Sequence, residues 1–199
     1  MPTTPTRTCE HCAGPMPLMA RQHARYCDTR CRSKAHRAKK TTLPVELTTA
    51  DRWIRRSATK VPLTTAGMAA SSTNSRTWST YTDAAASTIG AGLGFVLSDV
   101  DDIVCIDLDH CLSSDGALAP WAADIVSRAG ATYVEVSPSG DGLHIFGYAS
   151  VRQGRRIRRA DGYAVEVYSQ SRYIAMTGRR FQNAPSSLNN INGLVSTLV

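Results

Sequence analysis

The feature that most constrains this chain is the segment 104–109, in which three apolar side chains alternate with one Cys and two Asp. Successive side chains of a β-strand point to opposite faces, so the segment predicts a strand whose apolar face packs on a core. The other face then carries Asp107 and Asp109, two carboxylates one step apart. Like charges this close repel unless a cation lies between them, and a divalent metal ion with oxygen ligands meets that need. A strand that runs into an Asp-rich turn explains the segment equally well.

The length and hydropathy of the chain indicate one domain of ordinary size with a small appendage. The chain has 199 residues, of which 42% are hydrophobic, an ordinary content for a globular protein. No run of about 18 apolar residues predicts a membrane span, and the first residues lack the apolar core of a signal peptide. We therefore expect a cytoplasmic protein without a membrane partner.

The positive charge of the chain is concentrated at its N-terminus. The formal net charge is +7, and residues 1–40 alone hold nine Lys and Arg against two acids. The balance over residues 41–199 is zero. Such asymmetry is typical of an arm that binds a polyanion, most often nucleic acid. The alternative is a tail that only keeps the protein soluble.

Four of the six cysteines lie within residues 9–31 and have the spacing of a zinc site. The proposed ligands are Cys9, Cys12, Cys27 and Cys31. A CxxC pair followed by a CxxxC pair can place four thiolates tetrahedrally around Zn²⁺, which would stabilise a module too small to build a core. Disulfides or an unstructured arm are the alternatives, although a reducing compartment disfavours disulfides. Other candidate ligands are His11, His23 and His36.

The composition predicts three regions: a basic zinc-binding module over 1–40, a linker over 41–60 and a folded domain over 61–199. The linker is rich in Thr, Ser and Ala. The order of elements in the domain predicts an α+β fold, with a mostly antiparallel sheet and helices packed on one side. These elements are a helix from Thr77 to about Ser87, strands over 93–97 and 104–109, a helix over 119–129, strands over 132–137, 143–148, 163–168 and 172–177, and a closing helix within 187–199.

Two further strands carry an ionisable side chain opposite an apolar face. His144 lies on the strand 143–148, and Glu166 lies between two valines on the strand 163–168. If the apolar faces share one core, His144 and Glu166 converge with the Asp pair on the open face of the sheet. Taken singly, each has a simpler explanation, as a hydrogen-bonded core histidine and an exposed glutamate.

Three features near these strands suit a phosphate group. Ser139 and Gly140 belong to a glycine-containing loop over 137–142, where backbone amides can approach an anion. Five arginines fall within residues 152–159, at the expected tip of a hairpin that could hold a template backbone or a triphosphate. Arg172 opens the last strand. An ordinary glycine turn and a solvated loop are the alternatives for the first two features.

Together these residues resemble the archaeo-eukaryotic primase superfamily, in its phage and plasmid primase-polymerase branch. The first motif of that family, apolar residues followed by Asp-x-Asp, matches 106–109. The second, Ser-Gly-x-Gly-x-His, matches 139–144, and the third, an apolar residue and an acid, matches 165–166. The resemblance covers roughly residues 60–180, so the cysteine cluster lies outside it.

The resemblance implies an RRM-like catalytic core that performs template-directed nucleotidyl transfer in DNA replication. Its three acids, Asp107, Asp109 and Glu166, would bind two Mg²⁺ or Mn²⁺ ions. The nucleotide ligands it implies are Ser139, Gly140, His144 and Arg172. The partners it implies are a single-stranded DNA template, NTPs or dNTPs, and a separate replicative helicase.

Two departures from the family and two rival functions bear on this hypothesis. Many relatives continue into a helicase domain, and the chain ends soon after the third motif, so the accessory helices that help to start a primer would be missing. A rolling-circle initiator would need paired metal-binding histidines and a tyrosine nucleophile, and no His-x-His occurs. A catalytically inactive primase-like module that binds DNA at an origin is the other alternative.

Overall fold

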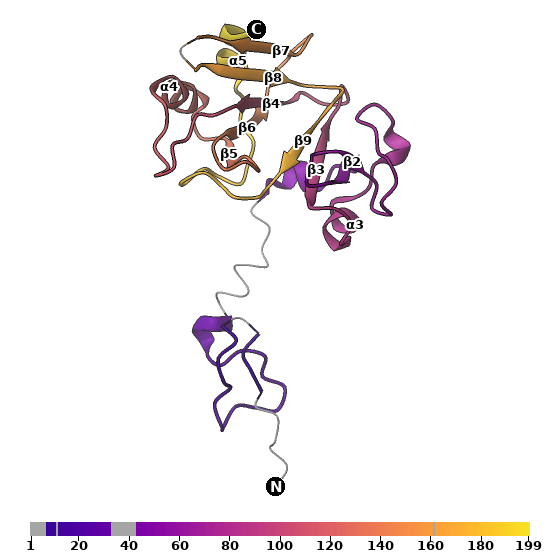
Figure 1. Cartoon of the computed structure of the whole chain (residues 1–199), viewed down its shortest axis with the longest axis vertical. Coiled ribbons are helices and arrows are strands. Elements are labelled where there is room, and N and C mark those ends of the chain that lie inside the picture. Colours follow the sequence, from indigo (N-terminus) through magenta and orange to yellow (C-terminus); the bar gives the residue numbers. More distant parts are fainter. Residues whose placement is uncertain (1–6, 11, 33–42, 161) are drawn as a thin grey trace. The chain divides into compact units, whose positions relative to one another are not determined.

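The computed structural model describes residues 7–10, 12–32, 43–160 and 162–199. The chain divides into two compact units, Met1–Thr41 and Thr42–Val199 (Figure 1). In the described residues, no helix has the length and apolar character needed to cross a membrane.

The smaller unit consists mainly of turns. An isolated bridge joins Thr8 to Pro15, and Arg25 donates from Nε and Nη2 to the two carboxylate oxygens of Glu10, at 2.7 and 2.6 Å. A helical turn follows over 29–32. The remainder of the basic stretch, together with His11 and His36, lies outside the described residues.

The described residues of the larger unit form two antiparallel sheets. The five-stranded sheet has the order β5 (Tyr133–Val136), β6 (Leu143–Tyr148), β4 (Ile103–Leu108), β8 (Ala164–Tyr168), β7 (Arg155–Arg158). The four-stranded sheet has the order β2 (Pro62–Leu63), β1 (Trp53–Arg56), β3 (Gly92–Leu97), β9 (Arg172–Met176). The helices are α2 (Val45–Thr48), α3 (Tyr81–Ala86), α4 (Pro120–Ala129), α5 (Asn192–Leu198) and the 3₁₀ helix η1 (Ser75–Thr77). The predicted α+β class is confirmed.

The two faces of the five-stranded sheet belong to different cores. Val104, Ile106 and Leu108 are fully buried on one face, in a cluster that includes residues of α4 and α5. On the other face, Cys105 and Phe146 join a second cluster with side chains of β1, β3 and β9. The chain crosses between the sheets after β3 and again after β8 (Figure 1). The second face is therefore where the two sheets meet.

Residues 43–60 do not form the expected linker. Trp53 and Ile54 of β1 are fully buried, and β1 pairs with both β2 and β3. The strand is hard to recognise because two of its four residues are Arg55 and Arg56. Both arginines are largely buried, and Arg55 donates to two backbone carbonyl oxygens, at 2.6 and 3.2 Å, which compensates the buried charge.

Several other expectations differ in detail from the structure. The single expected sheet is two sheets, because β3 pairs with β1 and β9 rather than with β4. The helix expected to start at Thr77 is α3, which begins at Tyr81, after Thr80, whose hydroxyl accepts from the backbone N–H of Asp83 at 3.1 Å. The arginine run was expected to be a hairpin tip, but it forms edge strand β7. The helix expected over 119–129 is α4, which ends at Gly130 with φ of +65°.

Candidate functional site

A row of five polar side chains crosses the whole five-stranded sheet. The Cα partners on neighbouring strands are, in order, Glu135, His144, Asp107, Glu166 and Arg156. The first four members are each two residues away from a position that packs on the second cluster, and Arg156 lies directly opposite Glu166, so all five project from the same face. The register therefore brings Asp107, His144 and Glu166 together on one face of the sheet, as the sequence predicts.

Glu135 anchors one end of this row. Its side chain is fully buried and accepts from the hydroxyl of Tyr133 at 2.9 Å. It also accepts from the backbone N–H groups of Thr177, at 3.1 Å, and Gly178, at 2.8 Å. Since N–H groups can only donate, both carboxylate oxygens of Glu135 act as acceptors in these bonds. Nδ1 of His144, 3.1 Å from Oε1 of Glu135, is then the donor of the remaining hydrogen bond.

This bond orients the imidazole toward Asp107. Nε2 of His144 lies 3.7 Å from Oδ1 of Asp107. The His144 side chain is only 5% exposed, whereas that of Asp107 is 24% exposed. The arrangement therefore keeps one ring nitrogen fixed in the protein and presents the other at the surface of the site.

Asp107 is an acid whose charge is poorly compensated. Burial raises the pKa of its carboxyl group, and the neighbouring carboxylates of Asp109 and Glu166 raise it further. His144 and Lys60 oppose these effects without cancelling them. A cation bound beside Asp107 would compensate the negative charge of this carboxylate.

Glu166 differs from Asp107 because cations surround it. Burial alone would raise the pKa of Glu166, but hydrogen bonds from Tyr168 and Arg156 and the nearby positive charge lower it below its ordinary value. Arg156 Nε donates to Oε1 at 2.5 Å, and Arg158 Nη2 donates to the same oxygen at 2.8 Å. The Tyr168 hydroxyl donates to Oε2 at 2.7 Å, and Arg172 Nη2 lies 3.9 Å from Oε2.

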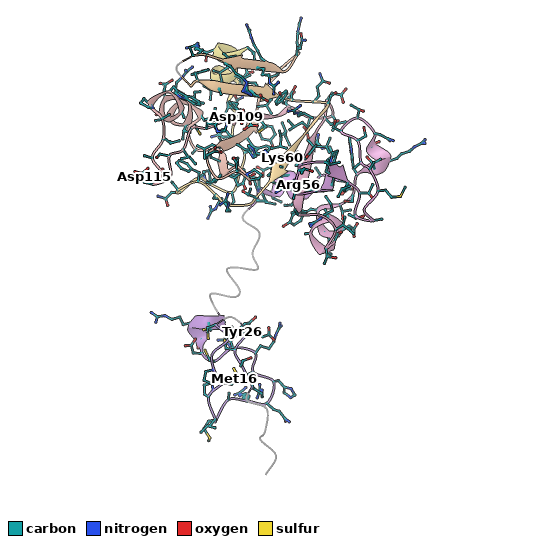
Figure 2. All side chains as sticks on the ribbon, viewed as in Figure 1. Met16, Tyr26, Arg56, Lys60, Asp109 and Asp115 are labelled. Atoms are coloured by element: carbon teal, nitrogen blue, oxygen red, sulfur yellow. The ribbon has the colours of Figure 1, made fainter. Side chains whose placement is uncertain are left out.

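Asp109 follows the end of β4 and is connected to this cluster through Arg158, whose Nη2 lies 3.2 Å from Asp109 Oδ2. Figure 2 marks Asp109 on the five-stranded sheet. Within the described part of the chain, the oxygens of Asp107, Asp109 and Glu166 do not all lie within 4.8 Å of one another. The three carboxylates have the oxygen donors that Mg²⁺ or Mn²⁺ prefers, but arginines hold two of them.

A cavity of about 400 Å³ opens beside Asp107 and His144. It brings these two residues together with Arg172, which begins β9, and with Lys60, which precedes β2. Figure 2 marks Lys60 near the four-stranded sheet. The backbone carbonyl of Lys60 accepts a hydrogen bond from the hydroxyl of Tyr173, another lining residue. The side of the four-stranded sheet therefore contributes the cationic side chains of the cavity, and the five-stranded sheet contributes Asp107 and His144.

The predicted phosphate loop lies at the end of β4 but does not line this cavity. Ser139 shares a hydrogen bond of 2.9 Å with the hydroxyl of Ser137 and donates another to Asp141. Gly140 has φ of +91°, which requires glycine in practice. A Cβ on Gly142 would lie 2.7 Å from the carbonyl oxygen of Leu108, so the loop packs against the end of the Asp strand.

The structure adds Glu135 and Lys60 to the site, and it places Arg156 and Arg158, from the run expected to hold phosphate, against the acids. Glu135 has a recognisable signal, because it alternates with apolar residues in the strand before the glycine loop. Arg156 and Arg158 alternate in the same way within the arginine run. No local sequence pattern marks Lys60, because it precedes a strand of only two residues. It lines the cavity only because the two sheets pack together.

The four cysteines of the smaller unit are close enough to hold one metal ion. All four sulfur atoms lie within 4.8 Å of one another, and those of Cys12 and Cys27 are 3.8 Å apart. The hydrogen bond with Cys27 and partial burial raise the pKa of the Cys31 thiol above its ordinary value. None of these four cysteines forms a disulfide. Four free thiols this close together provide the ligand type and the ligand number of a structural zinc site.

Comparisons with known proteins agree with the motifs. No protein-family model matches the chain. The chain is similar to a protein named DNA Primase-polymerase from Nitratiruptor phage NrS-1, with 38% identity over 136 residues. The alignment covers 65% of this chain and 19% of that protein, so the chain spans less than a fifth of the length of the relative. This similarity supports a relationship to phage primase-polymerases.

Proposed function

We propose that this protein is a nucleotidyltransferase that acts as a DNA primase or polymerase in phage or plasmid DNA replication. The observation that carries the proposal is the cross-strand row in which Asp107 lies between His144 and Glu166. These residues come from the three motifs that resemble the family, and the similarity to a phage primase-polymerase supports the same proposal. The five-stranded sheet with α4 and α5 on one face would be the RRM-like core.

Asp107, Asp109 and Glu166 would hold two divalent metal ions. Bound there, Mg²⁺ or Mn²⁺ would activate the 3′-hydroxyl and stabilise the charge that develops on the phosphate. The donor chemistry fits, because Asp107 lacks a strong positive partner and carboxylate oxygens are the preferred ligands of hard cations.

The cavity beside Asp107 would hold the incoming nucleotide. Its volume of about 400 Å³ lies in the range of small-molecule sites. Arg172 and Lys60 supply positive charge for the phosphates, and His144, held by Glu135, supplies an oriented ring nitrogen. Ser139 and Gly140 remain candidate phosphate ligands, since the loop that carries them packs against the end of β4.

The smaller unit would bind zinc through its four cysteines and contact single-stranded DNA. Its excess of arginine and lysine suits phosphate contacts, which position a protein on nucleic acid without base recognition. A separate replicative helicase would supply the template strand.

A polymerisation assay on single-stranded DNA tests the proposal. The protein is incubated with Mg²⁺ or Mn²⁺ and labelled NTPs or dNTPs, with and without a primer, beside the Asp107→Ala/Asp109→Ala double variant. Products that require a metal and vanish in the double variant would support a primase or polymerase, and products without a primer would establish initiation. Intact DNA binding with no product under any condition would instead indicate a non-catalytic DNA-binding module.

A further inference from the structure

Two arginines cover the third carboxylate of the proposed metal site. The Glu166 side chain is 4% exposed, whereas those of Arg156 and Arg158 are 60% and 52% exposed. Both guanidinium groups bond Oε1 of Glu166, and Arg158 also reaches Asp109 at 3.2 Å. The arginines therefore lie between Glu166 and solvent, on the side from which an ion would arrive.

The charges show what these arginines replace. Two guanidinium groups carry the charge of one divalent cation, and they occupy the lone pairs that such a cation would use. Arg155 and Ile157, which alternate with them on β7, lie opposite Val167 and Val165 and point to the other face of the sheet. The arginine run is thus divided between the two faces, and only two of its members enter the acid cluster.

We propose that Arg156 and Arg158 act as internal counter-ions that occupy the acid cluster until a divalent cation displaces them, after which they bind phosphate oxygens. This inference deepens the proposed function and rests on it. Arg156 and Arg158 are positioning residues for the cation, because they set how readily Glu166 and Asp109 accept it.

The geometry of β7 permits the displacement. It is an edge strand, paired only with β8 among the described strands, and its arginine side chains are more than half exposed. Once displaced from Glu166, the two guanidinium groups would lie near the proposed nucleotide site, where they could bind phosphate oxygens. Phosphate, like carboxylate, is a preferred bidentate partner of arginine. The phosphates could belong to the nucleotide or to the DNA backbone, and the two sources require separate measurements.

A structural ion pair is the competing explanation. A buried carboxylate requires compensation, and the two arginines supply it whether or not a metal ever binds. The explanations differ in one respect. If the arginines only stabilise the fold, their removal lowers stability without raising the affinity of the cluster for cations.

The first test is calorimetric titration of Mn²⁺ into the zinc-loaded full chain without nucleotide. We expect the Arg156→Ala/Arg158→Ala double variant to bind Mn²⁺ about 10- to 100-fold more tightly than the wild type, the fold-change that loss of competing charged hydrogen bonds implies. Each single variant should show a smaller increase, which keeps the test available if the double variant unfolds. Arg155→Ala, on the same strand but the other face, should leave the affinity unchanged.

The Asp107→Asn variant distinguishes failure of this inference from failure of the proposed function. Suppose that Mn²⁺ binding requires Asp107 but has the same affinity in the wild type and the arginine variants. That result would overturn the counter-ion role and still support the metal site. Absence of Asp107-dependent binding in every variant would overturn both.

The second test measures the phosphate contact at saturating Ca²⁺. A labelled nucleoside triphosphate and a single-stranded oligonucleotide are titrated separately into the wild type and the double variant. Weaker binding of the nucleotide alone would assign the displaced arginines to the triphosphate, and weaker binding of the oligonucleotide alone would assign them to the DNA backbone. Unchanged binding of both would overturn the release step.

Discussion

Glu135 and His144 are neighbours on adjacent strands, and Nδ1 of His144 lies 3.1 Å from Oε1 of Glu135. The histidine is therefore held from behind by a buried acid while its other ring nitrogen faces Asp107. A carboxylate that orients a histidine controls both its tautomer and its rotation. The contribution of Glu135 to the site can be measured separately from that of the residues facing the cavity.

Replacing Glu135 with Gln should reduce activity by about 10- to 100-fold, because the amide cannot accept all the hydrogen bonds that fix His144. The measurement is steady-state nucleotide incorporation. In a His144→Ala background the same replacement should have little further effect, since the residue it orients is already missing. Equal losses in both backgrounds would indicate that Glu135 acts only through the stability of the fold.

Asp107→Asn should stabilise the metal-free protein at neutral pH. Burial and the nearby acids raise the pKa of Asp107 in the folded state, so the wild type loses stability as pH rises from the unfolded to the folded pKa. Below the unfolded value the carboxyl is protonated in both states, and the advantage of Asn should disappear. Thermal unfolding across pH, in a chelator of divalent metals, gives the difference in Tm. A Tm gain that persists unchanged at acidic pH would contradict the prediction.

Truncation of Lys60 or Arg172 to Ala should weaken nucleotide binding, because each removes a positive charge from the cavity beside Asp107. We expect a loss of about 10-fold or more for each, typical of a charged hydrogen bond. Binding is measured by titration of a labelled nucleotide in Ca²⁺. Arg128→Ala on α4, on the opposite side of the sheet, is the matched control and should bind normally.

Removal of zinc should unfold the smaller unit alone. The smaller unit is too short to build a sizeable hydrophobic core, so its folding free energy would come mainly from a metal held by the four thiols, which lie within 4.8 Å of one another. A chelator, or the Cys27→Ser replacement, should expose residues 7–32 to proteolysis. The unfolding transition of the larger unit should stay in place, because that unit contains its own cores. Metal analysis that finds no zinc in the purified protein would contradict the assignment.

Trp53→Ala should destabilise the larger unit by about 3–5 kcal/mol, the usual cost of emptying a large aromatic site. Trp53 is fully buried, and its indole N–H donates to the backbone carbonyl of Leu47 at 2.9 Å. Denaturant unfolding measures the change. A value near zero would mean that residues 43–60 behave as the linker that their composition predicts.

The two patterns proposed to bind metal could be recognised in the sequence because each has a local cause. The alternation around Asp107 determines which face its carboxylate occupies, and the Cys spacing limits the smaller unit to a closed cluster of thiols. The strand over 143–148 and the helix over 119–129 were recognisable for the same reason, since their periodicity and their flanking glycines lie within a few residues. The roles assigned to the acids, His144, Ser139, Gly140 and Arg172 remain predictions.

The sequence by itself determined the α+β class, the alternation that turns the acids to one face, and the cysteine spacing. Only the tertiary structure decided that residues 43–60 belong to the core, that two sheets form instead of one, and that Glu135, Lys60 and the β7 arginines join the site. The physical reason is that strand pairing and burial join segments far apart in the chain. Trp53 acquires its neighbours only when β1 meets β3, and Glu166 acquires its arginines only when β7 pairs with β8.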